Sequence, residues 1–119
     1  MANENRISNR KKIGYYIQVF ENITLDLFGY IVDISHRGFR LDSVKPHGVN
    51  RDYTMRIELS DQSFEKNFIT FVARVMWIKP DPFDPSAFNE GYKIISISPA
   101  DEAIFNKMMD QYSAKKHSW

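Results

Sequence analysis

Short runs of alternating apolar and polar residues follow one another along most of the chain, a pattern typical of half-buried β-strands. The clearest run is YTMRIEL at residues 53–59, where every second side chain from Tyr53 is apolar and the others are polar. The same pattern predicts further strands at residues 15–20, 27–34, 39–43, 68–78 and 91–97. Because turns rather than helices join these runs, the sequence predicts an all-β fold with a six-stranded antiparallel β-barrel.

After the sixth run the period of the pattern changes to that of a helix. Ser98 stands where an N-cap is expected, Pro99 suits the first helical position, and Asp101 follows the cap by three residues, as in a capping box. An apolar stripe then recurs at helical spacing through Ile104, Met108, Met109 and Tyr112. The sequence therefore predicts one C-terminal α-helix that docks on the barrel through this stripe.

The segment between the fifth and sixth runs, KPDPFDPSAFNE at residues 79–90, contains three prolines and is predicted to be a loop instead of a strand or helix. Asp81 and Asp84 make it acidic, which suits a stiff solvated connection and, less commonly, a cation site. We divide the chain into a flexible basic arm at residues 1–14, a barrel with its helix at residues 15–112, and a tail at residues 113–119.

The composition is that of an ordinary globular chain, and it limits the possible functions. With 119 residues, 43% of them hydrophobic, the chain has room for one core. A net charge of +1 argues against a protein that coats DNA. The absence of cysteine excludes disulfides, thiolate catalysis and cysteine-bound zinc. Since no segment reads as a membrane span or a signal peptide, we expect a cytoplasmic protein without membrane insertion.

The sequence contains no recognisable motif of an enzyme active site. The three histidines, His36, His47 and His117, lie in separate segments, and no pair has the spacing of metal ligands on one element. A nucleophile elbow, a phosphate-binding loop and a dinucleotide fingerprint are missing as well. We therefore expect no catalysis, no bound metal and no cofactor.

Two polar clusters carry the candidate chemistry, and the first is the basic arm. Residues 1–12 hold four basic residues against one acidic residue, and Arg6 and Arg10 stand in an R-x-x-x-R spacing. In an extended chain their Cα atoms are at most ~14 Å apart, a reach that suits two guanidiniums gripping a small, bulky anion. Taken alone, such an arm is more often a solubilising tail.

The second cluster is DISHRG at residues 33–38, at the turn between the second and third strands. Asp33 and Ser35 are two residues apart, so they would point to the same side of an extended strand. A carboxylate there could accept from two adjacent N–H groups, the pattern that guanine shows along N1 and N2. Gly38 is expected to have a positive φ in the turn and to let a ligand approach the backbone. Taken alone, a turn whose side chains bond only their own backbone is the more common case.

The order and spacing of the two clusters resemble those of the PilZ domain family, bacterial receptors for the second messenger cyclic di-GMP. The family pattern is R-x-x-x-R before the first strand, then [D/N]-x-S-x-x-G on a barrel hairpin some twenty residues later. The matching segments are RISNR at residues 6–10 and DISHRG at residues 33–38, separated by 22 residues. The ARVMW strand, the EGYKIISISPADEAIF segment and the closing helix are also similar, so the resemblance spans nearly the whole chain.

The resemblance implies a role for each residue that matches the family pattern. Arg6 and Arg10 would wrap the ligand and meet its phosphate oxygens and the O6/N7 edge of guanine. Asp33, Ser35 and Gly38 would form the barrel half of the site and hold one guanine. The site implied by the resemblance thus has a flexible half and a rigid half.

Three further residues are secondary candidates for ligand binding. His36 and Arg37 occupy variable positions of the pattern, so the resemblance implies no role for them, although Arg37 has the charge to meet a phosphate. Trp77, in the ARVMW strand, has two possible roles. It either packs in or on the barrel, or it offers a stacking platform to a ligand at the barrel rim.

We expect the ligand to order the arm over the hairpin, so that an unidentified effector protein reads the combined surface. A second registration, in RKKIGYY, puts Lys11 and Tyr15 at the two arginine positions and loses the second arginine. That registration would favour a PilZ-like adaptor in motility or secretion that binds no nucleotide. A small barrel that binds single-stranded nucleic acid through the arm is a third possibility, against which the near-neutral charge weighs.

Overall fold

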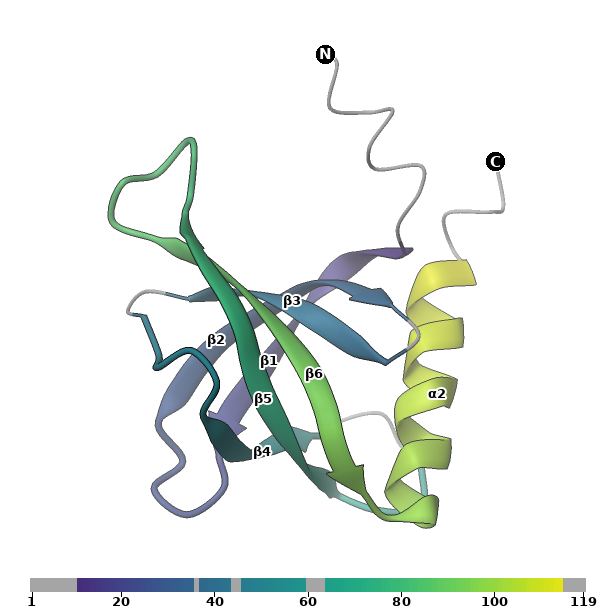
Figure 1. Ribbon diagram of the computed structural model, residues 1–119. Coiled ribbons are helices and arrows are strands. Elements are labelled where there is room, and N and C mark those ends of the chain that lie inside the picture. Colours follow the sequence, from purple (N-terminus) through teal and green to yellow (C-terminus); the bar gives the residue numbers. More distant parts are fainter. Residues whose placement is uncertain (1–10, 36, 44–45, 60–63, 115–119) are drawn as a thin grey trace.

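A computed structural model of the chain (Figure 1) describes residues 11–35, 37–43, 46–59 and 64–114, with side chains described within residues 17–111 of these segments. Several residues singled out in the sequence lie outside this description: Arg6, Arg10, His36, the side chain of Tyr112 and residues 115–119 of the tail. The described residues include the whole predicted barrel except parts of three connections.

Six strands and one helix make up the described chain: β1 (Lys11–Glu21), β2 (Leu27–Ser35), β3 (Gly38–Ser43), β4 (Asp52–Glu58), β5 (Phe68–Pro80), β6 (Phe88–Ile97) and α2 (Pro99–Ala114). The strands close into a barrel in the order β1-β2-β3-β6-β5-β4, and all neighbouring strands are antiparallel. The helix α2 lies along one side of the barrel in Figure 1 and contacts β1 and β5. The predicted six-stranded antiparallel barrel with a C-terminal helix is confirmed.

The barrel interior is filled by the apolar residues whose alternation predicted the strands. In β4, Met55 and Ile57 are buried, whereas Thr54 and Glu58 point outward and are exposed. The core gathers side chains from every strand and from the helix, including Val19, Ile31, Leu41, Ile57, Ile69, Val75, Tyr92 and Phe105. Because burying one large apolar side chain stabilises a protein by ~1.5–3 kcal/mol, this set drives closure of the barrel.

Three strands are longer, by two or more residues, than the sequence pattern predicted. β1 begins at Lys11, so residues 11–14, which we assigned to the arm, belong to a strand of the barrel. β5 continues to Pro80 and β6 begins at Phe88, and these two residues are partners in the sheet. The prediction of a loop over all of residues 79–90 was therefore wrong. A proline is tolerated at a strand end, where its missing N–H interrupts no further pairing.

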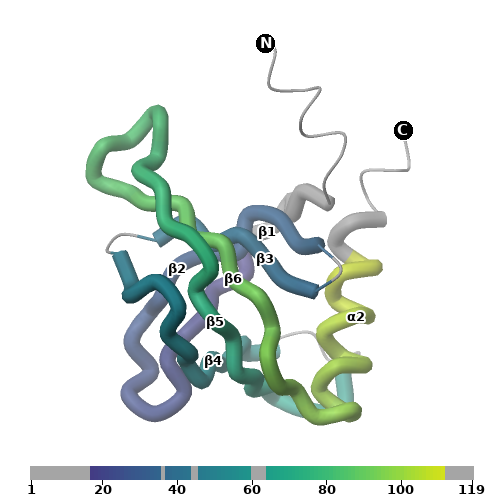
Figure 2. The backbone as a smooth tube through the Cα atoms, viewed as in Figure 1, coloured from purple at the N-terminus to yellow at the C-terminus, as the bar shows by residue number. Residues whose placement is uncertain are grey.

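The loop that remains between β5 and β6 projects beyond the barrel (Figures 1 and 2) and is held by its own side chains. Asp81 Oδ1 accepts from the N–H groups of Phe83 at 2.8 Å and Asp84 at 3.2 Å. Asp84 Oδ1 accepts from the N–H and the hydroxyl of Ser86, at 3.0 and 2.7 Å. Both carboxylates thus organise turns, which supports the stiff solvated connection over the cation site.

The N-terminus of α2 is capped as predicted, but its acidic residue has a different task. The Ser98 hydroxyl oxygen accepts from the backbone N–H of Asp101 at 3.2 Å, which confirms the N-cap. The Asp101 carboxylate accepts from Lys66 Nζ at 2.6 Å and from the Thr70 N–H at 3.1 Å. Asp101 is only 4% exposed. Through the bond to Thr70, its carboxylate ties the start of the helix to β5 instead of completing a capping box.

The buried face of α2 differs from the stripe that the sequence predicted. Phe105 and Met108 are buried, whereas Ile104 and Met109 are only partly buried. The Phe105 ring lies 6.0 Å from the ring of Phe71 in β5, measured between centroids. Helical spacing did not identify Phe105 as a buried residue, because apolar residues lie on more than one side of this helix. The way in which the helix packs on the barrel determines which side is buried.

One charged side chain lies among the core residues. Glu90 of β6 is fully buried, and its partner across the sheet is the core residue Leu41. The Glu90 carboxylate accepts from the His47 N–H at 2.7 Å and the Tyr92 hydroxyl at 3.0 Å, and it lies 2.9 Å from His47 Nδ1. Burial and the Glu90 charge raise the pKa of the Tyr92 phenol above its usual range. A buried carboxylate needs such partners, so Glu90 holds the loop between β3 and β4 against the barrel.

We expect Asp101→Ala to lower the free energy of unfolding by about 2 kcal/mol. The change leaves the Thr70 N–H without its acceptor and removes the contact with Lys66. Urea unfolding followed by circular dichroism measures the loss. The matched control is Asp110→Ala, an exposed position of the same helix, which should change the free energy by at most ~0.5 kcal/mol. Equal losses in both variants would show that the contact with β5 does not stabilise the fold.

Candidate functional site

The residues predicted to hold a ligand gather at the hairpin that joins β2 to β3. Ser35 is the last residue of β2 and Gly38 is the first of β3, and the two are partners across the turn. The Ser35 hydroxyl donates to the Gly38 carbonyl oxygen at 3.4 Å. Arg37 lies in the turn, and its carbonyl oxygen accepts from the Ile94 N–H of β6 at 2.9 Å. The tip of the hairpin is therefore held both by its own hydroxyl and by β6.

Gly38 is needed for a reason other than the one we predicted. It is not among the described residues with a positive φ, so the expectation of a left-handed turn residue was wrong. A Cβ at this position would lie 2.1 Å from the carbonyl oxygen of Tyr92 in β6. The missing side chain lets β6 approach the hairpin closely.

Asp33 faces away from the core because β2 contains an irregularity. Ile31 and Ile34 are both in the core although they are three residues apart, since a register shift between Ile31 and Asp33 adds one residue to β2. Asp33 then lies opposite Arg40 of β3, whose Nε donates to Asp33 Oδ2 at 3.0 Å. Arg40 Nη1 also donates to Asn89 Oδ1 at 3.1 Å. The carboxylate predicted for guanine is thus one end of a chain of polar contacts across three strands.

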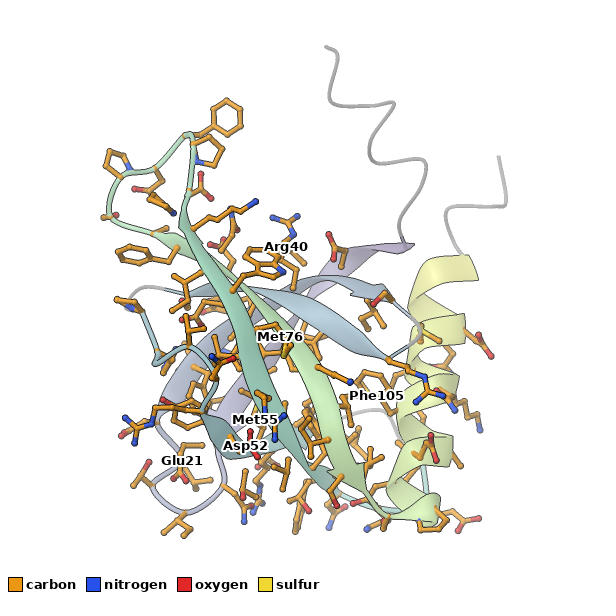
Figure 3. All side chains as sticks on the ribbon, in the orientation of Figure 1. Glu21, Arg40, Asp52, Met55, Met76 and Phe105 are labelled. Atoms are coloured by element: carbon orange, nitrogen blue, oxygen red, sulfur yellow. The ribbon has the colours of Figure 1, made fainter. Side chains whose placement is uncertain are left out.

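The sequence motifs did not identify Arg40 as a site residue. In β3, Phe39 and Leu41 are buried in the core, whereas Arg40 lies half-buried on the outer face. Arg40 is labelled in Figure 3, and its side chain is 26% exposed. An outward arginine just after the D-x-S-x-x-G turn was the available signal, because opposite charges on neighbouring strands pair when they are in register.

Trp77 lies in the same row of the sheet as Asp33 and Arg40. Partner residues run from Asp33 to Arg40, from Arg40 to Gly91 and from Gly91 to Trp77, across β2, β3, β6 and β5. A Cβ on Gly91 would lie 2.1 Å from Trp77 Nε1, so the indole lies across the glycine. Trp77 is 37% exposed, and Lys79 Nζ lies 5.4 Å from its ring centroid. Trp77 therefore packs on the outside of the barrel, within reach of a ligand.

The charges along this outer face are unevenly distributed. Arg37 and Arg40 lie on the hairpin side of the row, whereas the loop between β5 and β6 carries Asp81 and Asp84. Burial raises the pKa of the Asp42 carboxyl above its ordinary value, and the nearby charge of Asp81 raises it further, while Arg40 opposes the shift. An anionic ligand is therefore favoured beside the two arginines and disfavoured beside the acidic loop.

The predicted arm joins the barrel directly beside the hairpin. Lys12 of β1 is the partner of Asp33 across the sheet. Arg6, Arg10 and His36 themselves lie outside the described residues. The described part of β1 thus begins beside the strand that carries Asp33 and Ser35.

Two further observations concern the described residues as a whole. They include no group of three or more histidine, aspartate or glutamate side chains placed to hold a metal ion. The helix among them is not long and apolar enough to cross a membrane. The row of Asp33, Arg40 and Trp77, with Ser35 at the turn, offers a ligand a carboxylate, a guanidinium, an indole and a hydroxyl.

Fold and site together define a small closed β-barrel with a C-terminal helix and a polar hairpin in its wall. A comparison with known protein families matches residues 4–111 to the PilZ domain. The chain belongs to the PilZ domain family, in agreement with the resemblance of its motifs. PilZ domains are generally cyclic di-GMP-binding domains, which act as ligand-binding or adaptor domains rather than enzymes. Comparisons with curated proteins and with solved structures gave no match.

We expect Asp42→Asn to stabilise the protein at pH 7 and to have little effect near about pH 4. The pKa of Asp42 in the folded protein is raised above its ordinary value of 3.8, so the folded state binds this proton more tightly than the unfolded state. The charged form of Asp42 therefore destabilises the fold once the pH rises through the folded pKa. Urea unfolding of the variant and the wild type at the two pH values measures the difference.

The matched control for this experiment is Asp110→Asn, which removes the same charge from an exposed position on α2. A gain at pH 7 that is as large in Asp110→Asn would assign the effect to net charge. The burial of Asp42 beside Asp81 would then not be its cause.

Proposed function

We propose that this protein is a cytoplasmic cyclic di-GMP receptor that closes its N-terminal arm over the ligand and signals through a partner protein. The observation that carries the proposal is the pairing of Lys12 with Asp33, which attaches the arm at the hairpin of the second motif. Membership of the PilZ domain family supports the identity of the ligand, since these domains generally bind cyclic di-GMP.

The hairpin supplies the groups for guanine recognition. The Asp33 carboxylate suits the two adjacent N–H donors at N1 and N2 of guanine, and the Ser35 hydroxyl adds a small donor and acceptor at the exposed end of β2. Without ligand, Asp33 Oδ2 is engaged by Arg40 at 3.0 Å. Binding exchanges this contact for bonds to guanine, and it frees Arg40 to meet the O6/N7 edge of the base or a phosphate oxygen.

The arm supplies positive charge for the two phosphates. Arg6 and Arg10 reach opposite sides of the ligand, and each guanidinium pairs with phosphate oxygens in a bidentate manner. Fixing the backbone of the arm costs ~1–2 kcal/mol per residue, so the arm closes only when these charge-assisted bonds offset that cost. The alternative registration is disfavoured, because Lys11 and Tyr15 both belong to β1 and not to a segment ahead of the barrel.

Trp77 supplies a stacking surface for one of the guanines. Its indole lies across Gly91 in the row that contains Arg40, and it is held there without entering the core. A base stacked on an aromatic ring contributes ~1–3 kcal/mol to binding. Arg37, in the turn of the hairpin, adds a further positive charge on the side where the phosphates lie.

A PilZ adaptor that binds no nucleotide is the second candidate, and one observation favours it. Asp33 is already paired with Arg40, which also bonds Asn89, so the polar row is internally bonded without a ligand. Such an adaptor would use the same outer face for contacts with motility or secretion proteins.

We expect the wild type to bind cyclic di-GMP saturably in isothermal titration calorimetry, and Arg6→Ala/Arg10→Ala to bind at least about a hundredfold more weakly. Each arginine contributes a charge-assisted bond, whereas the described barrel closes without them. Circular dichroism of the double variant should therefore be unchanged. The matched control is Arg51→Ala, an exposed arginine in the connection between β3 and β4, which should bind as the wild type does.

Two outcomes of this titration would contradict the proposal in different ways. Undiminished binding by Arg6→Ala/Arg10→Ala would contradict the closing arm but not the receptor. No heat of binding from a folded wild type would leave the nucleotide-free adaptor as the function.

We expect cyclic di-GMP to quench the fluorescence of Trp77 in a Trp119→Phe background, where Trp77 is the only tryptophan. Trp77→Ala should weaken binding about tenfold, because one stacked base loses its platform. The matched control is Met76→Ala, the exposed neighbour of Trp77 in β5, which should leave the affinity unchanged. Unchanged fluorescence at saturation would mean that the bound guanines lie away from Trp77.

A further inference from the structure

The strand β6 continues beyond the end of its neighbour β3. Their pairing ends with Gly38 and Lys93, followed by one bond from the Ile94 N–H to the Arg37 carbonyl oxygen at 2.9 Å. Ser96 and Ile97 still pair with β5 on their other side, whereas Ile95 lies at a register shift between β5 and β6. No described residue is a strand partner of these three residues on the side where β3 has ended. This short edge of the barrel therefore presents main-chain groups that a further strand can use.

A groove of about 440 Å³ lies along this edge. Its walls are the last residues of β6, the first turns of α2 and the tip of the hairpin between β2 and β3. In Figures 1 and 2, β6 and α2 diverge from their junction. Arg37 of the hairpin lines the groove between them. Ile95 is 38% exposed there, with Phe105 at the base of the groove and polar Asn106 on the helix.

We propose that this groove binds an extended segment of another protein, which adds a strand to the free edge of β6. Edge addition of this kind uses main-chain hydrogen bonds for affinity and side-chain contacts for specificity. The added strand takes the place that β3 leaves, so it runs antiparallel to β6, as β3 does. Its apolar side chain covers Ile95, which the described chain leaves open.

The charges at the two ends of the groove define the partner segment further. Arg37 stands at the end where β3 stops, beside Ile94. Glu102 stands at the other end, because its N–H bonds the Ser98 carbonyl oxygen in the first turn after β6. An antiparallel segment begins at the Glu102 end, so complementarity requires a basic residue first, apolar residues in the middle and an acidic residue last.

The groove goes beyond the proposed ligand site, although Arg37 lies between residues of the D-x-S-x-x-G motif. Recognition here depends on residues 94–97 of β6 and on α2, and none of these residues belongs to the row of Asp33, Arg40 and Trp77. An experiment without nucleotide therefore tests the groove separately from the receptor function.

The experiment titrates the full ligand-free chain with the capped peptide Lys-Thr-Val-Thr-Val-Asp and follows the amide signals by NMR. We expect saturable shifts at the amides of residues 95–97, and about fivefold weaker binding of the charge-exchanged peptide Asp-Thr-Val-Thr-Val-Lys. Glu102→Lys should abolish the preference between the two peptides. The matched control is Asp110→Lys, the same change on an exposed part of α2 outside the groove, which should retain the preference.

Main-chain pairing is tested with two peptides that carry N-methyl groups at alternate residues. In an added strand, only alternate N–H groups face the edge of β6. One of the two methylated peptides should therefore lose binding, and the other should bind as the parent peptide does. Equal binding by both would overturn strand addition.

Three further results would overturn the proposal. The first is the absence of shifts at residues 95–97 at millimolar peptide. The second is slow hydrogen exchange, in the peptide-free monomer, of an amide in residues 95–97 that faces away from β5, which would show that the chain itself covers the edge. The third is concentration-dependent dimerisation that Glu102→Lys abolishes, which would assign the groove to a second copy of the protein.

Discussion

The pairing of β3 with β6 is the contact on which both the barrel and its polar face depend. These strands are far apart in the sequence, yet Arg40 lies opposite Gly91 and Gly38 lies opposite Lys93. Gly38 makes the approach possible, since a Cβ there would meet the Tyr92 carbonyl oxygen of β6. A second glycine, Gly91, leaves room for the Trp77 indole of β5 on the same face. Without this pairing, the hairpin and Trp77 would belong to separate parts of the molecule.

The same pairing brings a buried charge into the barrel. Glu90 lies opposite the core residue Leu41, and its carboxylate is bonded by His47 and Tyr92. Desolvating a carboxylate is costly, so the groups that bond it are held firmly and the connection between β3 and β4 is fastened to β6. The rigid wall behind the hairpin thus rests on a polar contact as well as on apolar packing.

A hairpin whose carboxylate is already bonded suits the proposed closure of the N-terminal segment over a ligand. Arg40 bonds both Asp33 and Asn89 without a ligand, and a nucleotide can supply donors and acceptors in place of these contacts. In the proposed receptor, the barrel half of the site is organised before binding, so the cost of ordering would fall on the N-terminal segment. This division suits a receptor whose response is the closure of one segment over its ligand.

Local signals accounted for much of the fold and for part of the candidate site. Alternation identified all six strands, and the residues around Ser98 identified the start of the helix, because strand and cap preferences act over a few residues. The D-x-S-x-x-G spacing likewise identified the hairpin. The same local reasoning misjudged Gly38 and the role of Asp101, whose neighbours in space come from β6 and β5.

By itself, the sequence determined that this chain forms a small antiparallel barrel with a closing helix, and that its polar chemistry is concentrated in one hairpin and one basic segment. Only the tertiary structure decided that Arg40 bonds Asp33, that Trp77 shares their row, and that β6 continues past the start of β3 beside α2. The reason is that these relations follow from strand order, register and the residue added to β2. Such features are set by packing between distant segments, and the spacing of residues along the chain does not encode them.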